Sequence, residues 1–100
     1  MFKNRKSIEQ VEESNELAPK FDENGLIVVT TIDAETSEIL MVGYMSRESL
    51  QKTIETKEAH YFSRSRNVIW HKGASSGYVQ KINEILVDDD QDALCIKVNI

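Results

Sequence analysis

The chain has 100 residues, of which 40% are hydrophobic and 29% are charged, and its net charge at pH 7 is −5. This length fits one domain, and the acidic balance argues against a nucleic-acid-binding protein, which normally has a basic excess. No apolar run approaches the ~20 residues that a membrane-spanning helix needs, and no apolar run follows the basic N-terminus as in a secretory signal. The only cysteine, Cys95, excludes an intrachain disulfide, so we expect a cytoplasmic protein.

The N-terminal part, residues 1–19, is predicted to be a peripheral arm of this single domain. Ser7-Ile8-Glu9-Gln10 has the form of a capping box and predicts a short helix from Ser7 to about Asn15. Pro19, the only proline, separates the arm from the rest of the chain.

The next segments predict a hairpin and a helix. The β-branched run 26–32 predicts a strand, and residues 38–45 predict its hairpin partner. Both runs carry apolar residues at both parities, so we expect burial on both faces, by the core or by a partner chain. Ser46 is the predicted N-cap of a helix that runs to about Lys57.

Four further strands are predicted in the second half, at 59–63, 68–72, 79–87 and 93–100. The expected fold is therefore mainly β (α+β), a small strand-rich domain with one or two short helices. A chain of this size buries a small core, so oligomerisation would be a natural supplement to its stability.

An acidic cluster lies between the last two predicted strands. Asp88, Asp89, Asp90 and Asp92 place four carboxylates within five residues, which repel one another unless a cation lies among them. In an extended segment Asp88, Asp90 and Asp92 would point to one side and Asp89 to the other. Three such oxygen ligands suit Mg²⁺ or Ca²⁺. A solvated acidic turn without a metal is the alternative.

A basic segment precedes this cluster, because residues 59–83 contain four Lys or Arg and no acidic residue. If Ser63-Arg64-Ser65-Arg66 is a strand, its two Arg lie on one face and its two Ser on the other. Arginine grips phosphate bidentately, and serine hydroxyls add donors. An exposed edge strand with solvated arginines is the alternative. A basic segment followed by an acidic cluster suggests an anionic ligand beside a divalent cation.

Trp70-His71-Lys72-Gly73-Ala74-Ser75-Ser76-Gly77 predicts a loop whose backbone N–H groups could meet phosphate, although it lacks the P-loop pattern. Trp70 could stack on a base or belong to the core. His60 and His71 are each more typical of a hydrogen-bonded structural residue than of a catalytic one.

The order of these segments carries more information than any one of them. The series runs Gly43-Tyr44-Met45, Glu58-Ala59-His60-Tyr61-Phe62-Ser63-Arg64-Ser65-Arg66, Trp70-His71-Lys72-Gly73, Ser76-Gly77, Val79-Gln80-Lys81 and Val87-Asp88-Asp89-Asp90-Gln91-Asp92-Ala93-Leu94. From about Leu17 to Val98 it closely resembles the phosphoribosyl-AMP cyclohydrolase family of histidine biosynthesis.

The resemblance implies an enzyme, a metal-dependent hydrolase that opens the adenine ring of phosphoribosyl-AMP between N1 and C6 with Zn²⁺ and Mg²⁺. It also implies an intertwined homodimer with active sites at the subunit interface. The family's Mg²⁺ aspartates map onto Asp88, Asp90 and Asp92. Zinc would lower the pKa of a bound water and supply hydroxide. For the two substrate phosphates we expect the following binding residues: Arg64, Arg66, Lys72 and Ser76.

Two departures from the family pattern bear on zinc. Asp89 occupies the position where the family usually has a cysteine ligand, and Cys95 is out of register for that role. The family's later Cys-His segment and further cysteine, which complete the zinc site and supply a catalytic histidine, are not found before Ile100. The sequence therefore predicts an incomplete zinc site and leaves the catalytic residue unknown.

Two alternatives stay open at this point. One is a catalytically incomplete, dimeric relative that binds phosphate and Mg²⁺; the other is a Mg²⁺-dependent nucleotide phosphohydrolase. The reading frame beyond Ile100 is the observation that would separate the cyclohydrolase from the incomplete relative.

Overall fold

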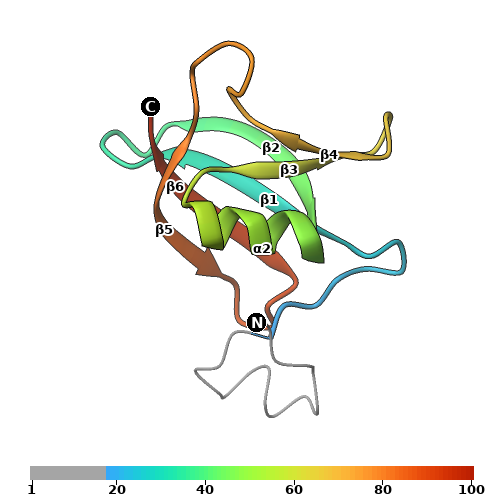
Figure 1. Ribbon diagram of the computed structural model, residues 1–100. Coiled ribbons are helices and arrows are strands. Elements are labelled where there is room, and N and C mark those ends of the chain that lie inside the picture. Colours follow the sequence, from blue (N-terminus) through green and yellow to red (C-terminus); the bar gives the residue numbers. More distant parts are fainter. Residues whose placement is uncertain (1–17) are drawn as a thin grey trace.

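The computed structural model describes residues 18–100, so the predicted helix at 7–15 and most of the predicted arm lie outside the described residues. Within this range the strand-rich content and a single short helix confirm the predicted mainly β class (Figure 1). No helix of residues 18–100 is long and apolar enough to cross a membrane. The elements are β1 (Leu26–Asp33), β2 (Ile39–Ser46), α2 (Arg47–Thr56), β3 (His60–Ser63), β4 (Val68–His71), β5 (Lys81–Val87) and β6 (Ala93–Asn99).

The strands form a four-stranded sheet in the order β2-β1-β6-β5 and a separate two-stranded sheet, β3-β4. β1 pairs antiparallel with β2, as the predicted hairpin requires, and β5 pairs antiparallel with β6. The two hairpins join through a parallel pairing of β1 with β6. This pairing brings the acidic turn between β5 and β6 to the end of the sheet where β1 begins (Figure 1).

One face of the large sheet carries the core. Ile27 and Val29 of β1 and Ile96 of β6 belong to one core cluster, and all three are almost completely buried. Leu50 projects from α2, and Tyr61 from β3, into the same cluster. Figure 1 shows α2 lying across this face, so the helix and the small sheet cover one side of the large sheet.

The opposite face of the large sheet is open within residues 18–100. Val42 of β2 is 61% exposed and Leu86 of β5 is 40% exposed, while Thr30 and Cys95 between them are half-buried. The expected burial of β1 and β2 on both faces is therefore not achieved by the described part of one chain. We call this surface the open face.

The helix begins where the sequence predicts. Ser46 is the N-cap, its Oγ accepts the N–H of Ser49 at 3.1 Å, and the Oγ of Ser49 accepts the N–H of Ser46 at 2.8 Å. The helix ends at Thr56, and its C-cap, Lys57, adopts the left-handed conformation with φ of 60°. The return into β3 follows at once, because the N–H of His60 donates to Thr53 Oγ1.

Candidate functional site

The acidic cluster is a tight turn between β5 and β6, so the side-to-side alternation that an extended segment would give does not apply. One carboxylate oxygen, Asp88 Oδ1, accepts the N–H groups of Asp92 at 3.0 Å and Ala93 at 3.2 Å. Gln91 has a positive φ of 60°, and its N–H donates to the backbone carbonyl of Asp88. These bonds curl the backbone around Asp88, which the alternation rule for strands does not anticipate.

The turn nevertheless gathers the three carboxylates that the sequence singled out. Oxygen atoms of Asp88, Asp90 and Asp92 lie within 4.8 Å of one another, and all three side chains are exposed. Asp89 is not part of this group. Three hard oxygen donors that leave room for water match the coordination that Mg²⁺ prefers, so these residues fit that ion.

The crowding of charge moves two pKa values in opposite directions. Hydrogen bonds to Asp88 and Asp90, together with the repulsion of their charges, raise the pKa of Asp92 to about 6. Desolvation acts to raise the pKa of Asp88, but hydrogen bonds from Asp92 and from the backbone of Ala93 outweigh it and lower that pKa. One carboxyl of the cluster thus holds its proton more tightly than usual, as four clustered acids predict.

The described residues do not form a set of ligands that fits zinc. Among residues 18–100, the only group of three or more potential ligands from His, Cys, Asp and Glu is the aspartate cluster. Cys95 is half-buried on β6, and His60 and His71 have other partners described below. A tetrahedral zinc site needs at least three protein ligands, so residues 18–100 of one chain do not form one.

The arginine segment is a turn, so the condition under which its two arginines would share one face is not met. β3 ends at Ser63, and residues 64–67 form a turn in which Asn67 has a φ of 56°. Ser63 causes this break, because its Oγ accepts the N–H of Arg66 at 3.3 Å and its carbonyl accepts the N–H of Asn67 at 2.7 Å. The two arginines therefore do not share the face of a strand.

Arg64 turns toward the large sheet. Its guanidinium carbon lies 4.0 Å from the centre of the Tyr44 ring, a cation–π contact. Tyr44 in turn lines a hollow of about 300 Å³ together with Lys20, Phe21 and Asp92. The acidic turn and Arg64 thus border one region of a single chain, which we call the turn hollow.

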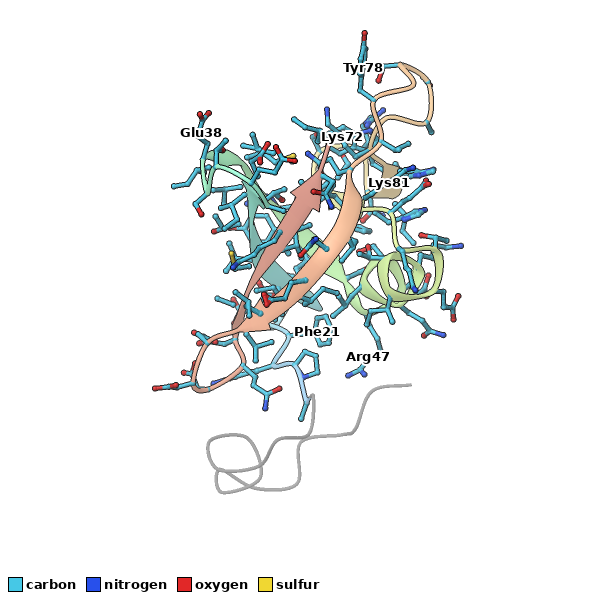
Figure 2. The ribbon with its side chains drawn as sticks, turned by 90° about the vertical axis from the view of Figure 1, so that its left-hand side faces the viewer. Phe21, Glu38, Arg47, Lys72, Tyr78 and Lys81 are labelled. Carbon is cyan, nitrogen blue, oxygen red and sulfur yellow. The ribbon has the colours of Figure 1, made fainter. Side chains whose placement is uncertain are left out.

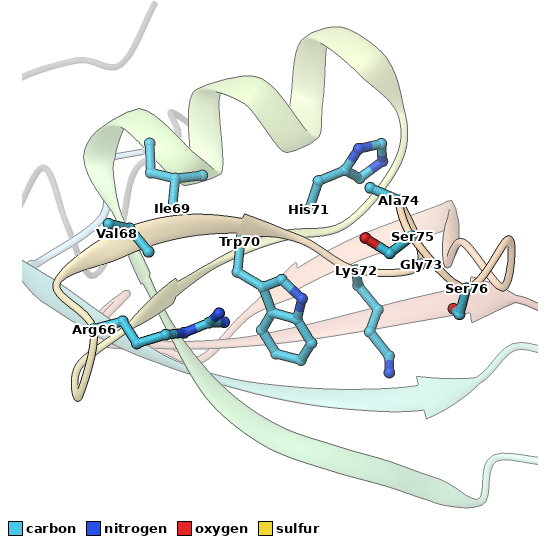
Figure 3. Close-up of a pocket in the computed structure, with 10 residues that line it drawn as sticks. All are labelled: Arg66, Val68, Ile69, Trp70, His71, Lys72, Gly73, Ala74, Ser75 and Ser76. Carbon is cyan, nitrogen blue, oxygen red and sulfur yellow. The ribbon is translucent and has the colours of Figure 1, made fainter.

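The other predicted phosphate ligands gather elsewhere. Arg66, Lys72 and Ser76 line a second hollow of about 350 Å³ along β4, which we call the β4 hollow. Figure 3 shows Arg66, Trp70 and Lys72 on one side of β4, and the Nζ of Lys72 lies 5.3 Å from the centre of the Trp70 ring. Trp70 also packs against the core, one of the two roles that the sequence allowed, and its stacking on a base stays a prediction.

The glycine loop is more self-contained than a phosphate-binding loop. The N–H of Gly77 donates to the Gly73 carbonyl at 2.8 Å, and the N–H of Ala74 donates to the His71 carbonyl. Gly73 has a φ of 86°, and a Cβ there would lie 2.3 Å from the backbone of Tyr78. Glycine is therefore required at this position to close the loop, and at least two of the loop's N–H groups are engaged within it.

The two histidines lie against each other, which sequence reasoning did not anticipate. Their rings stack with centres 4.2 Å apart and planes 9° apart. His71 Nε2 donates to Glu58 Oε1 at 2.8 Å, and His60 Nδ1 donates to the backbone carbonyl of Glu58, also at 2.8 Å. The pairing of β3 with β4 places His60 directly opposite His71, so a correct register prediction would have found the pair.

Comparisons with known proteins identify the family of this chain. Residues 41–100 match the family described as phosphoribosyl-AMP cyclohydrolase. Two similar proteins named phosphoribosyl-AMP cyclohydrolase come from strains of Rhodopseudomonas palustris. The protein of strain BisB18 is 53% identical over 92 residues, which cover 92% of this chain and 63% of that protein. The protein of strain BisA53 is 56% identical over 90 residues, which cover 90% of this chain and 61% of that protein. One from Methanococcoides burtonii is 54% identical over 80 residues, covering 80% of this chain and 66% of that protein. The chain spans less than two thirds of the length of these curated relatives. With more than half of its residues matched, the chain belongs to the phosphoribosyl-AMP cyclohydrolase family.

Proposed function

We propose that this protein acts in histidine biosynthesis as a metal-dependent hydrolase that opens the adenine ring of phosphoribosyl-AMP between N1 and C6. The observation that carries the proposal is the convergence of Asp88, Asp90 and Asp92 within 4.8 Å, at the border of a hollow that Tyr44 and Asp92 line. A bound Mg²⁺ would supply positive charge to which phosphate or ribose oxygens of the substrate could bind.

Basic side chains support a substrate with two phosphates. Arg64 borders the turn hollow, while Arg66, Lys72 and Ser76 line the β4 hollow. Two separate sets of cationic groups suit an anion whose phosphates lie at opposite ends, as in phosphoribosyl-AMP. Guanidinium groups add bidentate hydrogen bonds to phosphate oxygens, and Lys72 adds a point charge.

We also propose a homodimer, with a second copy of the chain as the cover of the open face. Val42 and Leu86 are exposed there, and the turn hollow lies at the end of the same face, since Val28 and Tyr44 belong to both. A partner on this face would therefore also border the acidic turn. This placement supports an active site shared between two subunits.

We propose a second candidate function, ligand binding without catalysis. A relative that binds phosphate and Mg²⁺ without catalysis needs the aspartate cluster and the basic hollows, but no zinc site. Among residues 18–100, neither Cys95 nor either histidine belongs to a group of three ligands. This second candidate therefore predicts ligand binding without turnover.

Incubation of the protein with phosphoribosyl-AMP separates the two functions. We expect a product heavier by one water molecule, detected by mass spectrometry, in the presence of Mg²⁺ and Zn²⁺ and its loss after chelation. Substrate binding measured by titration calorimetry, without any product under either metal, would identify the non-catalytic relative. Neither binding nor product would reject both.

A further inference from the structure

Gln91 is the one member of the acidic turn without a charge, and it is almost fully buried. Its exposed fraction is 4%, although both of its neighbours, Asp90 and Asp92, belong to the carboxylate cluster. It also has a left-handed backbone with φ of 60°, a conformation that a non-glycine residue seldom adopts. A buried amide in a strained conformation indicates that specific partners hold it there.

Two partners of Gln91 lie more than seventy positions away in the sequence. Its side-chain Oε1 accepts the N–H of Ala18 at 2.7 Å, a buried hydrogen bond between residues 73 positions apart. Its backbone carbonyl accepts the N–H of Lys20, also at 2.7 Å. A single residue of the turn therefore fixes the segment 18–22, which we call the strap, at two points.

The strap forms a wall of the turn hollow. Lys20, Phe21 and Asp22 line it on one side, and Asp92 lines it from the acidic turn. Figure 2 shows Phe21 low on the molecule near Arg47, whose guanidinium carbon lies 4.9 Å from the centre of the Phe21 ring. Asp22 Oδ1 accepts the N–H groups of Asn24 and Leu26, which closes the strap onto the start of β1. The strap is thus anchored at one end by Gln91 and at the other by β1.

We propose that Gln91 is a positioning residue that couples cation binding at Asp88, Asp90 and Asp92 to the placement of the strap. This inference rests on the Mg²⁺ site of the proposed function. The two carboxylates that flank Gln91 can hold a cation only when the backbone between them is fixed, and the strap's two N–H groups help to fix that backbone. By thermodynamic reciprocity, a cation bound at the turn must favour the docked strap as much as the docked strap favours the cation.

The consequence for the site is that the strap takes its place as a wall of the turn hollow when the metal is bound. Lys20 and Phe21 offer a cation and an aromatic face to whatever occupies the turn hollow. Without the anchor at Gln91, these side chains lose their fixed relation to Asp92. Gln91 thereby positions both the strap and the acidic turn while it contacts neither metal nor substrate.

Backbone hydrogen exchange measured by NMR tests the coupling directly. In the parent protein, Mg²⁺ is expected to slow exchange at the Ala18 and Lys20 amides. Gln91→Met keeps the length of the side chain but removes the acceptor, so Ala18 exchange should become roughly fivefold faster, the scale of one net hydrogen bond. In this variant Mg²⁺ should bind about tenfold more weakly, within the usual range of coupling between sites, and should no longer slow Ala18 exchange.

Two further variants serve as controls. Gln91→Glu retains an acceptor oxygen at the same reach and should keep the protection of Ala18, even if Gln91→Met folds poorly. Gln51→Met makes the same chemical change on α2, where Gln51 bonds only the exposed Glu55, and should behave like the parent.

The possible failures are distinguishable. If Mg²⁺ does not bind the parent protein, both the metal site of the proposed function and the proposed coupling are wrong. If Mg²⁺ binds the parent and Gln91→Met equally, or binds the parent without slowing Ala18 exchange, the coupling alone is overturned. Loss of Ala18 protection in Gln91→Glu as well would assign the effect to packing rather than to the acceptor.

Discussion

Tyr61 shows how one polar side chain ties the two sheets together. Its hydroxyl donates to Gln80 Oε1 at 2.6 Å and bonds Thr31 Oγ1 on β1 at 2.5 Å, while its ring is 1% exposed. Gln80 also receives the N–H of Ala59 on its backbone carbonyl. These bonds explain why β5 begins at Lys81, two residues later than predicted, because Gln80 is held by β3 and its neighbours instead of by β6.

Burial of Tyr61 gives the first prediction, a loss of stability at alkaline pH. Burial raises the pKa of Tyr61 to about 12, although its hydrogen bond to Thr31 acts to lower it. An unfolded tyrosine ionises near pH 10, so between about pH 10 and 12 the folded state holds more protons and the free energy of unfolding falls as pH rises. We expect a decline of up to about 3 kcal/mol in denaturant melts, absent in Tyr61→Phe. The same decline in both proteins would assign it to other groups.

The second prediction concerns the cationic residues of the β4 hollow. Arg66→Ala and Lys72→Ala should each weaken substrate binding by about 1.5–3 kcal/mol, the range for charge-assisted hydrogen bonds. Lys52→Ala is the matched control, because Lys52 is an exposed cation on α2 outside both hollows. Titration calorimetry with phosphoribosyl-AMP measures the effect. Unchanged affinity in both hollow variants would identify these residues as solvated surface cations.

At the scale of elements, periodicity and capping patterns predict where the strands and the helix lie. They do not predict the geometry within the turns. The six strands and α2 lie close to their predicted positions, because apolar alternation and the Ser46 cap are local signals. The positions of the turns at 64–67 and 88–92 follow from the predicted strand ends, but their internal geometry does not. That geometry is set by backbone N–H groups that donate to Ser63 Oγ and Asp88 Oδ1, and sequence alternation does not record such bonds.

The same limit applies to the site. The three aspartates could be named from spacing, and the structure brings them together. By contrast, the contacts of Arg64 with Tyr44 and of Gln91 with Ala18 join residues 20 and 73 positions apart. Such pairs depend on strand order, and the parallel pairing of β1 with β6 has no local signal in the sequence.

The third prediction belongs to the acidic turn. Millimolar Mg²⁺ should raise the melting temperature of the protein, because an ion that binds only the folded state stabilises it by mass action. Asp90→Asn should reduce this rise more than Asp89→Asn, since Asp89 lies outside the carboxylate group. The two variants remove the same charge from adjacent positions, so they differ only in geometry. Thermal melts with equal rises in all three proteins, or none in the parent, would leave the cluster as an acidic turn without a metal.

For the whole molecule, the apolar open face is the main surface whose burial would add to the stability of the fold. The core on the opposite side of the sheet is complete, with Ile27, Val29, Leu50 and Ile96 at or below 1% exposure. A 100-residue chain buries only a modest share of its surface, so leaving a second apolar face in water forgoes stabilisation of roughly 25 cal/mol per Å². A second copy is the cover that the proposed shared active site requires.

The last prediction tests this cover with one charge on the open face, at the edge strand β2. Val42 pairs with Thr30 on the central strand and is 61% exposed in a single chain, so a partner on this face would bury it. Val42→Lys should therefore weaken self-association, because an ammonium group buried without a counter-charge is costly. Gln51→Lys adds the same charge on α2, which covers the other face, and should leave association unchanged. Sedimentation at micromolar concentration is expected to show a dimer for the parent and for Gln51→Lys and a larger monomer fraction for Val42→Lys. A parent that sediments only as an 11.4 kDa species would show that the open face remains uncovered in solution.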